Sequence, residues 1–172
     1  MALSYAARMP RPPFVIRAAD VPEREHIYPN SDEKMSPSRA VGHAAGMRRI
    51  GIHIVRVAPG TRTSYPHAEE DEEEFVYVLE GECDAWIDGD LVRVRAGDFV
   101  AFPAGTGICH TFINDGDRDA LLLAGGEQAK SDSRIYYSRN LERRGDMPWS
   151  AWWEDVPARP QGSHPGTPAR RK

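Results

Sequence analysis

Cysteine is scarce in this chain of 172 residues, which contains only Cys83 and Cys109. Two thiols without a CxxC spacing provide neither a disulfide framework nor a zinc knuckle, so we expect both to be reduced and structural. Long apolar runs are missing as well. No stretch approaches the ~20 residues of a membrane-spanning helix, and residues 1–20 lack the uninterrupted apolar segment of a signal peptide. The sequence therefore predicts a cytoplasmic protein that does not bind a membrane.

Basic charge is in the minority. Lysine and arginine total 22 against 26 acidic residues, for a net charge of −4 at pH 7. The six consecutive acids of Glu69–Glu74 more than account for this excess, because the remaining 20 acids face 22 bases. The sequence has no basic stripe or basic face interleaved with aromatic residues, and residues 170–172 are interpreted as a solvated basic end. We therefore expect no nucleic-acid partner.

The length suits one domain with a core and two tails. Prolines are frequent in residues 1–45, which predicts an extended N-terminal arm that packs along the outside of the domain rather than forming a helix. Residues 46–140 consist of short β-branched and aromatic runs about ten residues apart, divided by Gly or Asp, as in an antiparallel sandwich or barrel. The fold class is therefore predicted to be all-β.

Residues 141–172 are predicted to hold a packed turn and then an extended or disordered tail. Trp149, Trp152 and Trp153 have the spacing i, i+3, i+4, so one helical turn would press all three against the barrel as a packing anchor. Prolines and glycines dominate after Val156.

Two motifs carry the functional information, and they occur in order. The first contains Gly60, His67, Glu74 and Gly81, and the second contains Gly97, Pro103, Gly105, His110 and Asn114. The spacing of both resembles that of the cupin superfamily, over roughly residues 46–126. The resemblance implies a double-stranded β-helix, or jelly-roll barrel, and metal ligands at His67, Glu74 and His110.

The first motif departs from the family pattern at its second histidine. If His67 takes the first ligand position, Glu69 stands where the second histidine belongs; in the other register Tyr65 is first and His67 second. We favour His67 with Glu69, because this register keeps the family spacing to Glu74 and from there to Gly81. Side chains two apart on a strand share a face, so His67 and Glu69 can both point inward.

Two imidazoles with one or two carboxylates suit a divalent transition metal such as Fe, Mn, Ni or Zn, without choosing among them. Glu69 is the candidate general base if the ion does not engage it. Val76 and Phe112 share faces with the ligands and predict an apolar wall, which suits a small organic ligand or substrate. Cys109 should face the opposite side from His110.

The resemblance leaves the reaction open among dioxygenase, isomerase and lyase types. The alternative is a non-catalytic small-molecule-binding or sensor cupin, possibly free of metal. Residues 70–73 are interpreted as a solvated loop. Among the other histidines, His26, His43 and His164 are predicted to lie on the surface, and His53 to be a satisfied strand residue.

The chain is also predicted to form a homodimer. Both faces of residues 74–81 and 119–126 are apolar, and one barrel interior covers only one face of each. The proline-rich arm is the expected participant in that contact.

Overall fold

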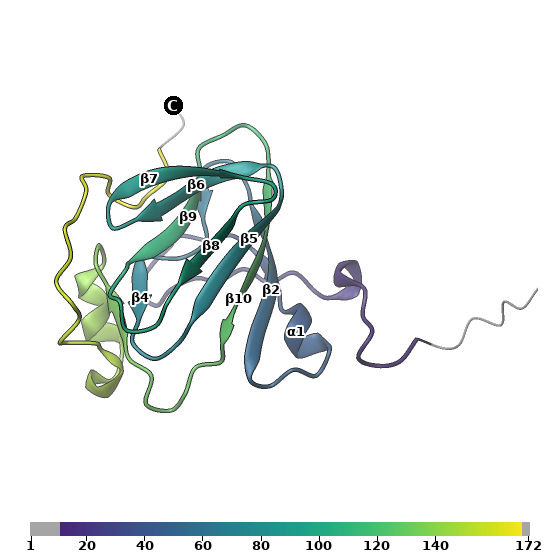
Figure 1. The fold of residues 1–172 in the computed structure, drawn as a ribbon, viewed down its shortest axis with the longest axis horizontal. Coiled ribbons are helices and arrows are strands. Elements are labelled where there is room, and N and C mark those ends of the chain that lie inside the picture. The colour runs from purple at the N-terminus through teal and green to yellow at the C-terminus, as the bar shows by residue number, and fades with distance from the viewer. Residues whose placement is uncertain (1–10, 170–172) are drawn as a thin grey trace, which may run out of the picture.

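The computed structural model describes residues 11–169, so residues 1–10 of the arm and the basic residues 170–172 lie outside the description. Two antiparallel sheets face each other in a barrel (Figure 1). In spatial order, the first sheet contains β1 (Ser38–Arg39), β2 (Ile50–Val57), β10 (Ala120–Glu127), β5 (Glu74–Glu80) and β8 (Phe99–Phe102). The second contains β11 (Ile135–Tyr137), β4 (His67–Glu69), β9 (His110–Asn114), β6 (Glu82–Ile87) and β7 (Asp90–Arg95), with β3 (Thr61–Arg62) also paired to β9. The all-β prediction is confirmed.

Alternating side chains build the core between the sheets. On β5, Val76 and Val78 are buried, whereas Tyr77 points outward. Val55 and Val57 of β2 and Leu122 of β10 complete this part of the interior, as the two-residue period of a strand requires.

A tight turn joins β6 to β7 at Asp88 and Gly89, both at positive φ (48° and 96°). Asp-Gly readily adopts this primed geometry, which keeps the twist of the two strands continuous.

The arm follows an extended path but is not wholly without helix. Residues 11–20, with a short 3-10 turn at Ala18–Asp20, project from the barrel, and β1 then pairs with β2 (Figure 1). A single helical turn, α1 (Val41–Ala44), was not predicted; it lies beyond the last proline of the arm. Gly42 allows this turn to approach β2, because a Cβ there would lie 3.0 Å from the backbone nitrogen of Ile52.

The tryptophan turn differs from the prediction. Two 3-10 segments, η2 (Leu141–Asp146) and η3 (Trp149–Ala151), replace a continuous helix. Trp152 and Trp153 are buried, but the Trp149 side chain is 70% exposed and lies under the Arg144 guanidinium. Because the chain is extended again at Trp152, helical spacing no longer places the three indoles on one face.

The tail after Val156 is extended and lies against the barrel. The backbone nitrogens of Gly162 and His164 donate to the carbonyls of Asp88 and Gly89. The buried Arg62 guanidinium then joins the tail to the arm, since it donates to the carbonyl of Gly166 and to the carboxylate of Glu33. None of the helices among residues 11–169 has both the length and the apolar character needed to cross a membrane.

Candidate metal centre and pocket

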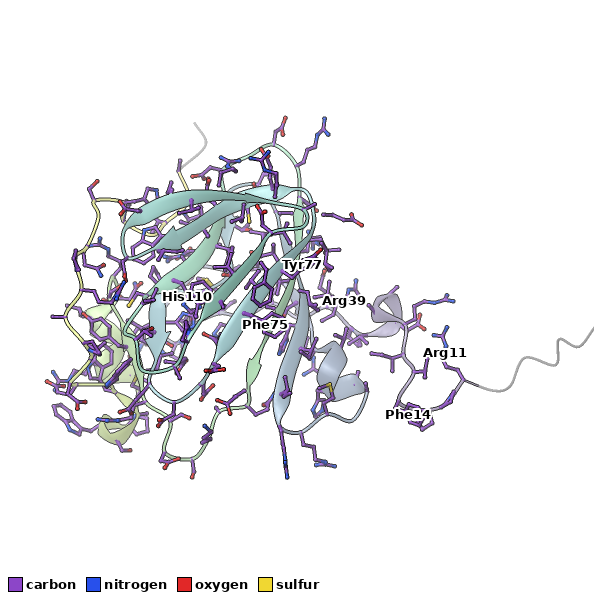
Figure 2. The ribbon with its side chains drawn as sticks, in the orientation of Figure 1. Arg11, Phe14, Arg39, Phe75, Tyr77 and His110 are labelled. Atoms are coloured by element: carbon purple, nitrogen blue, oxygen red, sulfur yellow. The ribbon has the colours of Figure 1, made fainter. Side chains whose placement is uncertain are left out.

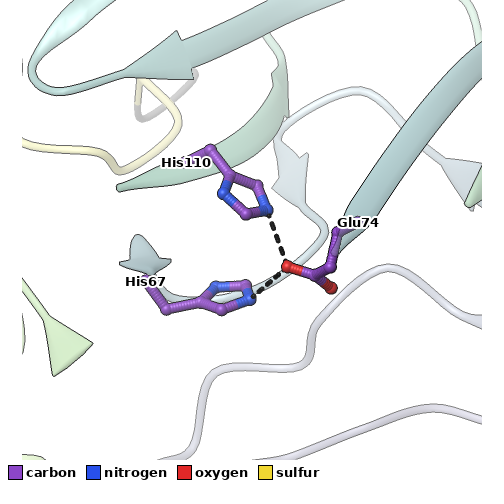
Figure 3. Close-up of side chains that lie close together, drawn as sticks. All are labelled: His67, Glu74 and His110. Carbon is purple, nitrogen blue, oxygen red and sulfur yellow. Dashed lines mark ion pairs between the residues drawn. The ribbon is translucent and has the colours of Figure 1, made fainter. Parts of the chain in front are cut away.

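Three side chains from both sheets converge on one point. His67 and His110 begin β4 and β9 and are direct partners in the register of that sheet, while Glu74 begins β5 of the facing sheet. One ligand atom from each residue lies within 4.8 Å of the others. Glu74 Oε2 is 3.2 Å from His110 Nε2 and 3.6 Å from His67 Nε2 (Figure 3). The geometry therefore brings together two imidazole nitrogens and a carboxylate oxygen, a donor set that suits a divalent ion.

Neighbouring groups orient both rings. His67 Nδ1 is 2.8 Å from the carbonyl oxygen of Tyr65, which can only accept, so Nδ1 carries the proton and Nε2 is left to face Glu74. The His110 ring stacks on Phe102 with their centroids 3.5 Å apart and an interplanar angle of 7°. Such supporting contacts fix the rotamers of a metal-binding imidazole before any ion arrives.

Charge within the cluster is tightly coupled. Burial alone would lower the pKa of His67, but the nearby Glu74 carboxylate and the negative charge of Glu69 raise that pKa to about 9. Burial likewise opposes ionisation of Glu74, yet the two imidazoles hold its pKa well below the ordinary value. The pKa of His110 is lowered, chiefly by burial. Without an ion, the cluster is therefore a His67 imidazolium and a Glu74 carboxylate beside a neutral His110.

Glu69 does not join the group of converging ligand atoms. It lines a small cavity of about 10 Å³ together with Glu74 and His110, and a space of that size holds about one water molecule. Burial, helped by the charges of Glu74 and Glu72, raises the pKa of Glu69 to about 7. The carboxyl group thus lies beside the candidate metal centre and titrates near neutral pH.

Tyr65 belongs to a different part of the molecule. Its hydroxyl donates to Ser31 Oγ at 2.7 Å, and its ring stacks on Tyr28 with centroids 4.2 Å apart. The register that would make Tyr65 the first ligand finds no support in this arrangement.

The rest of the acidic run forms the connection between β4 and β5. Asp71 and Glu73 are exposed, as expected of a solvated loop. Glu70 is different, because its carboxylate pairs with Arg134.

The cluster opens into a pocket of about 390 Å³ between the sheets. Val76 and Phe112 lie in its wall, as the sequence predicted, and Cys109 packs on the opposite side of β9 against Trp86 and Trp153.

The sequence did not assign two histidines to this pocket. His53, predicted to be a satisfied strand residue, lines it. His26 is exposed, as predicted, and also lines the pocket from the arm. The alternation of His53 with the buried Val55 and Val57 is a signal that could have placed it inside. No comparable signal exists for His26, whose position depends on the path of the arm.

Comparison with known proteins agrees with this architecture. Residues 53–125 match the family model of the cupin domain, Cupin_2. Over 83 residues the chain is 36% identical to the polyketide synthase CurC of Streptomyces cyaneus, a match covering 48% of this chain and 49% of that protein. The chain thus spans about half the length, or less, of the curated relatives it matches.

Two solved structures resemble the whole barrel. A protein assigned as a sugar phosphate isomerase from Acidithiobacillus ferrooxidans is 26% identical with a TM-score of 0.67, covering 73% of this chain and 81% of its own. A cupin-superfamily sugar phosphate isomerase from Silicibacter pomeroyi is 28% identical with a TM-score of 0.65, covering 72% and 81%. Residues 53–125 therefore form a cupin domain, and the barrel as a whole resembles proteins of the cupin superfamily.

Proposed function

We propose that the protein is a metal-dependent cupin enzyme that acts on a small organic molecule. The observation that carries this proposal is the convergence of His67, Glu74 and His110 on one point beside an apolar-walled pocket. Buried charged groups are costly unless they are paired or bind a metal, so their placement inside the barrel requires a reason.

His67, Glu74 and His110 would hold the ion. A bound divalent metal would supply Lewis acidity toward an oxygen atom of the substrate. The Tyr65 carbonyl keeps His67 Nε2 turned toward the centre, and Phe102 fixes the plane of His110. We assign proton transfer to the carboxyl group of Glu69, because it lies next to the centre without belonging to the ligand cluster.

Metal analysis tests this assignment. We expect wild-type protein to contain a stoichiometric transition metal by inductively coupled plasma mass spectrometry, and His67→Ala, Glu74→Ala or His110→Ala to lose most of it, since an incomplete ligand shell remains. His43→Ala is the matched control, because this exposed histidine lies on α1. Full metal occupancy in both His67→Ala and His110→Ala would refute the site.

A metal-free binding or sensor protein is the second candidate. One observation favours it: the Glu74 carboxylate already faces the His67 imidazolium and the neutral His110 ring, so the cluster can persist as a polar core without an ion. Purified protein that contains no metal but retains a bound organic molecule would support this function over catalysis.

We further propose that two copies pair through the outer face of the first sheet. Figure 2 shows Phe75 and Tyr77 beside β5, and Phe99 of the neighbouring β8 stacks on Phe75 and is 61% exposed. Exposed aromatic side chains gathered on one sheet face favour association. Light scattering should give a dimer for the wild type and a monomer for Tyr77→Glu/Phe99→Glu. A wild-type monomer at micromolar concentration would refute the pairing.

A further inference from the structure

The charges that line the pocket restrict what it can bind. No lysine or arginine among residues 11–169 lines it; its ionisable groups are histidines, Glu74 and Glu127. A phosphate group held away from a metal ion needs charge-assisted hydrogen bonds, which arginine and lysine supply best. The pocket therefore lacks the groups that would recognise a phosphorylated substrate, in spite of the two isomerases that the barrel resembles.

The walls favour a flat apolar molecule. Val55, Val76, Phe102, Phe112 and Leu122 contribute apolar side chains from five different strands. Phe102 and Phe112 meet edge to face with centroids 6.2 Å apart, so aromatic surface lines one side. On β10 the lining residues Ala124 and Gly126 are small, and the Glu74 side chain lies against Gly126, where a Cβ would be 3.1 Å from Glu74 Cγ.

His53 lines the pocket from the same sheet as Glu74, on the other side of β10. Its strand β2 is separated from β5 by β10 alone, so the two backbones lie about 10 Å apart. Within residues 11–169 the His53 side chain makes no hydrogen bond, although it is half-buried. Burial lowers its pKa, so the ring is neutral at pH 7 and offers one donor and one acceptor. The ring is therefore free to form a hydrogen bond with a molecule bound in the pocket.

We propose that the pocket takes an uncharged, planar molecule about two fused rings long, with an oxygen atom facing the His67–Glu74–His110 cluster and a polar group at its far edge bonded to His53. This rests on the proposed function, because the cluster provides one of the two anchoring ends. His53 is a specificity-determining residue in this arrangement. It binds the edge of the substrate that lies away from the reacting atoms.

Three matched naphthalenes test the inference by fluorescence titration of the purified full chain. We expect 2,6-dihydroxynaphthalene, which has a hydroxyl group at each end, to bind more tightly than 2-naphthol, which has a hydroxyl group at one end only. The anionic 6-hydroxy-2-naphthoate tests whether the pocket prefers an uncharged molecule. Fructose 6-phosphate, added as a competitor, tests whether the pocket prefers a phosphorylated one. We expect His53→Leu to weaken the diol about five- to tenfold, as expected for one hydrogen bond, and to leave 2-naphthol unchanged.

Controls make each outcome decisive. His53→Gln retains a hydrogen-bonding group and should restore most of the diol affinity, and His43→Leu changes an exposed histidine of α1 and should have no effect. Three results would each overturn the inference. The first is an equal loss of affinity for 2-naphthol and the diol in His53→Leu. The others are tighter binding of fructose 6-phosphate than of the diol, and no binding of either naphthol at millimolar concentration. Metal content measured in parallel in the wild type, His67→Ala and His110→Ala separates it from the proposed function, which fails if both variants retain full metal occupancy.

Discussion

The coupling between Glu74 and His67 can be tested without knowing the metal. In metal-free protein, Glu74→Gln keeps the shape of the side chain but removes its charge. At the observed 3.6 Å, the attraction between carboxylate and imidazolium amounts to roughly 5 kcal/mol with an effective dielectric constant of about 20. Burial subtracts from this, and the rise of the His67 pKa from 6.5 to about 9 corresponds to a net stabilisation of the imidazolium of roughly 3 kcal/mol.

We expect Glu74→Gln to lower the pKa of His67 from about 9 to below 6.5, because burial is then no longer opposed by the carboxylate. NMR titration of the His67 ring protons in protein treated with a chelator measures this directly. The raised pKa stabilises the folded protein fully below pH 6.5, and this stabilisation is lost as the pH rises through 9. The difference in the free energy of unfolding between wild type and Glu74→Gln should therefore become smaller between pH 6.5 and pH 9.

The matched control is Glu73→Gln, which removes an exposed acid from the adjacent loop position and should leave the titration of His67 unchanged. A wild-type His67 that titrates near 6.5, or a Glu74→Gln variant that still titrates near 9, would show that the two side chains are not paired as described. Either result would also remove the electrostatic basis for placing a metal ion between them.

Three further predictions follow from the same structure. Because His67 is protonated below pH 9 in the metal-free site, binding of a divalent ion at pH 7 should release about one proton. The affinity for the ion should therefore rise about tenfold per pH unit. Calorimetry in buffers of different ionisation enthalpy measures the proton release, and an affinity that does not depend on pH would contradict the prediction. Glu69→Gln should retain metal and lose turnover; loss of metal by elemental analysis would instead make Glu69 a ligand. Gly89→Ala should lower the free energy of unfolding in urea by about 1–3 kcal/mol more than Gly97→Ala. Both glycines have positive φ, but only Gly89 lies against the Gly162 carbonyl. Equal decreases in the two variants would mean that the tail does not pack against this turn.

The convergence of His67, Glu74 and His110 could be predicted from sequence because its information is local. His67 and Glu74 begin consecutive strands, and His110 begins a strand in the second motif, so motif spacing and strand alternation together place all three inside the barrel. Glu69 was harder to assign. Alternation on β4 predicts its side but not its distance from the other ligands, which depends on how the strand is set against β9.

The rest of the pocket depends on contacts distant in sequence. His53 could be assigned to the interior from its strand, but whether an interior histidine has a hydrogen-bonding partner is a property of the folded molecule. His26 reaches the pocket only because the arm returns along the barrel. Trp149 was misassigned for a related reason: its spacing to Trp152 matters only if the helix continues, and η3 ends at Ala151.

The Arg62 guanidinium has a consequence for how the molecule opens. It holds Glu33 of the arm and Gly166 of the tail at the same buried point on β3, so neither of these two residues can detach without leaving a buried cation short of a partner. Ser36 and Ser38, which line the pocket, lie just beyond Glu33 in the arm. Local unfolding of the tail and of the arm should therefore occur as one event, and amide hydrogen exchange in the two segments should share a single opening free energy. The segment of the arm that lines the pocket is in this way connected, through Glu33 and Arg62, to the tail.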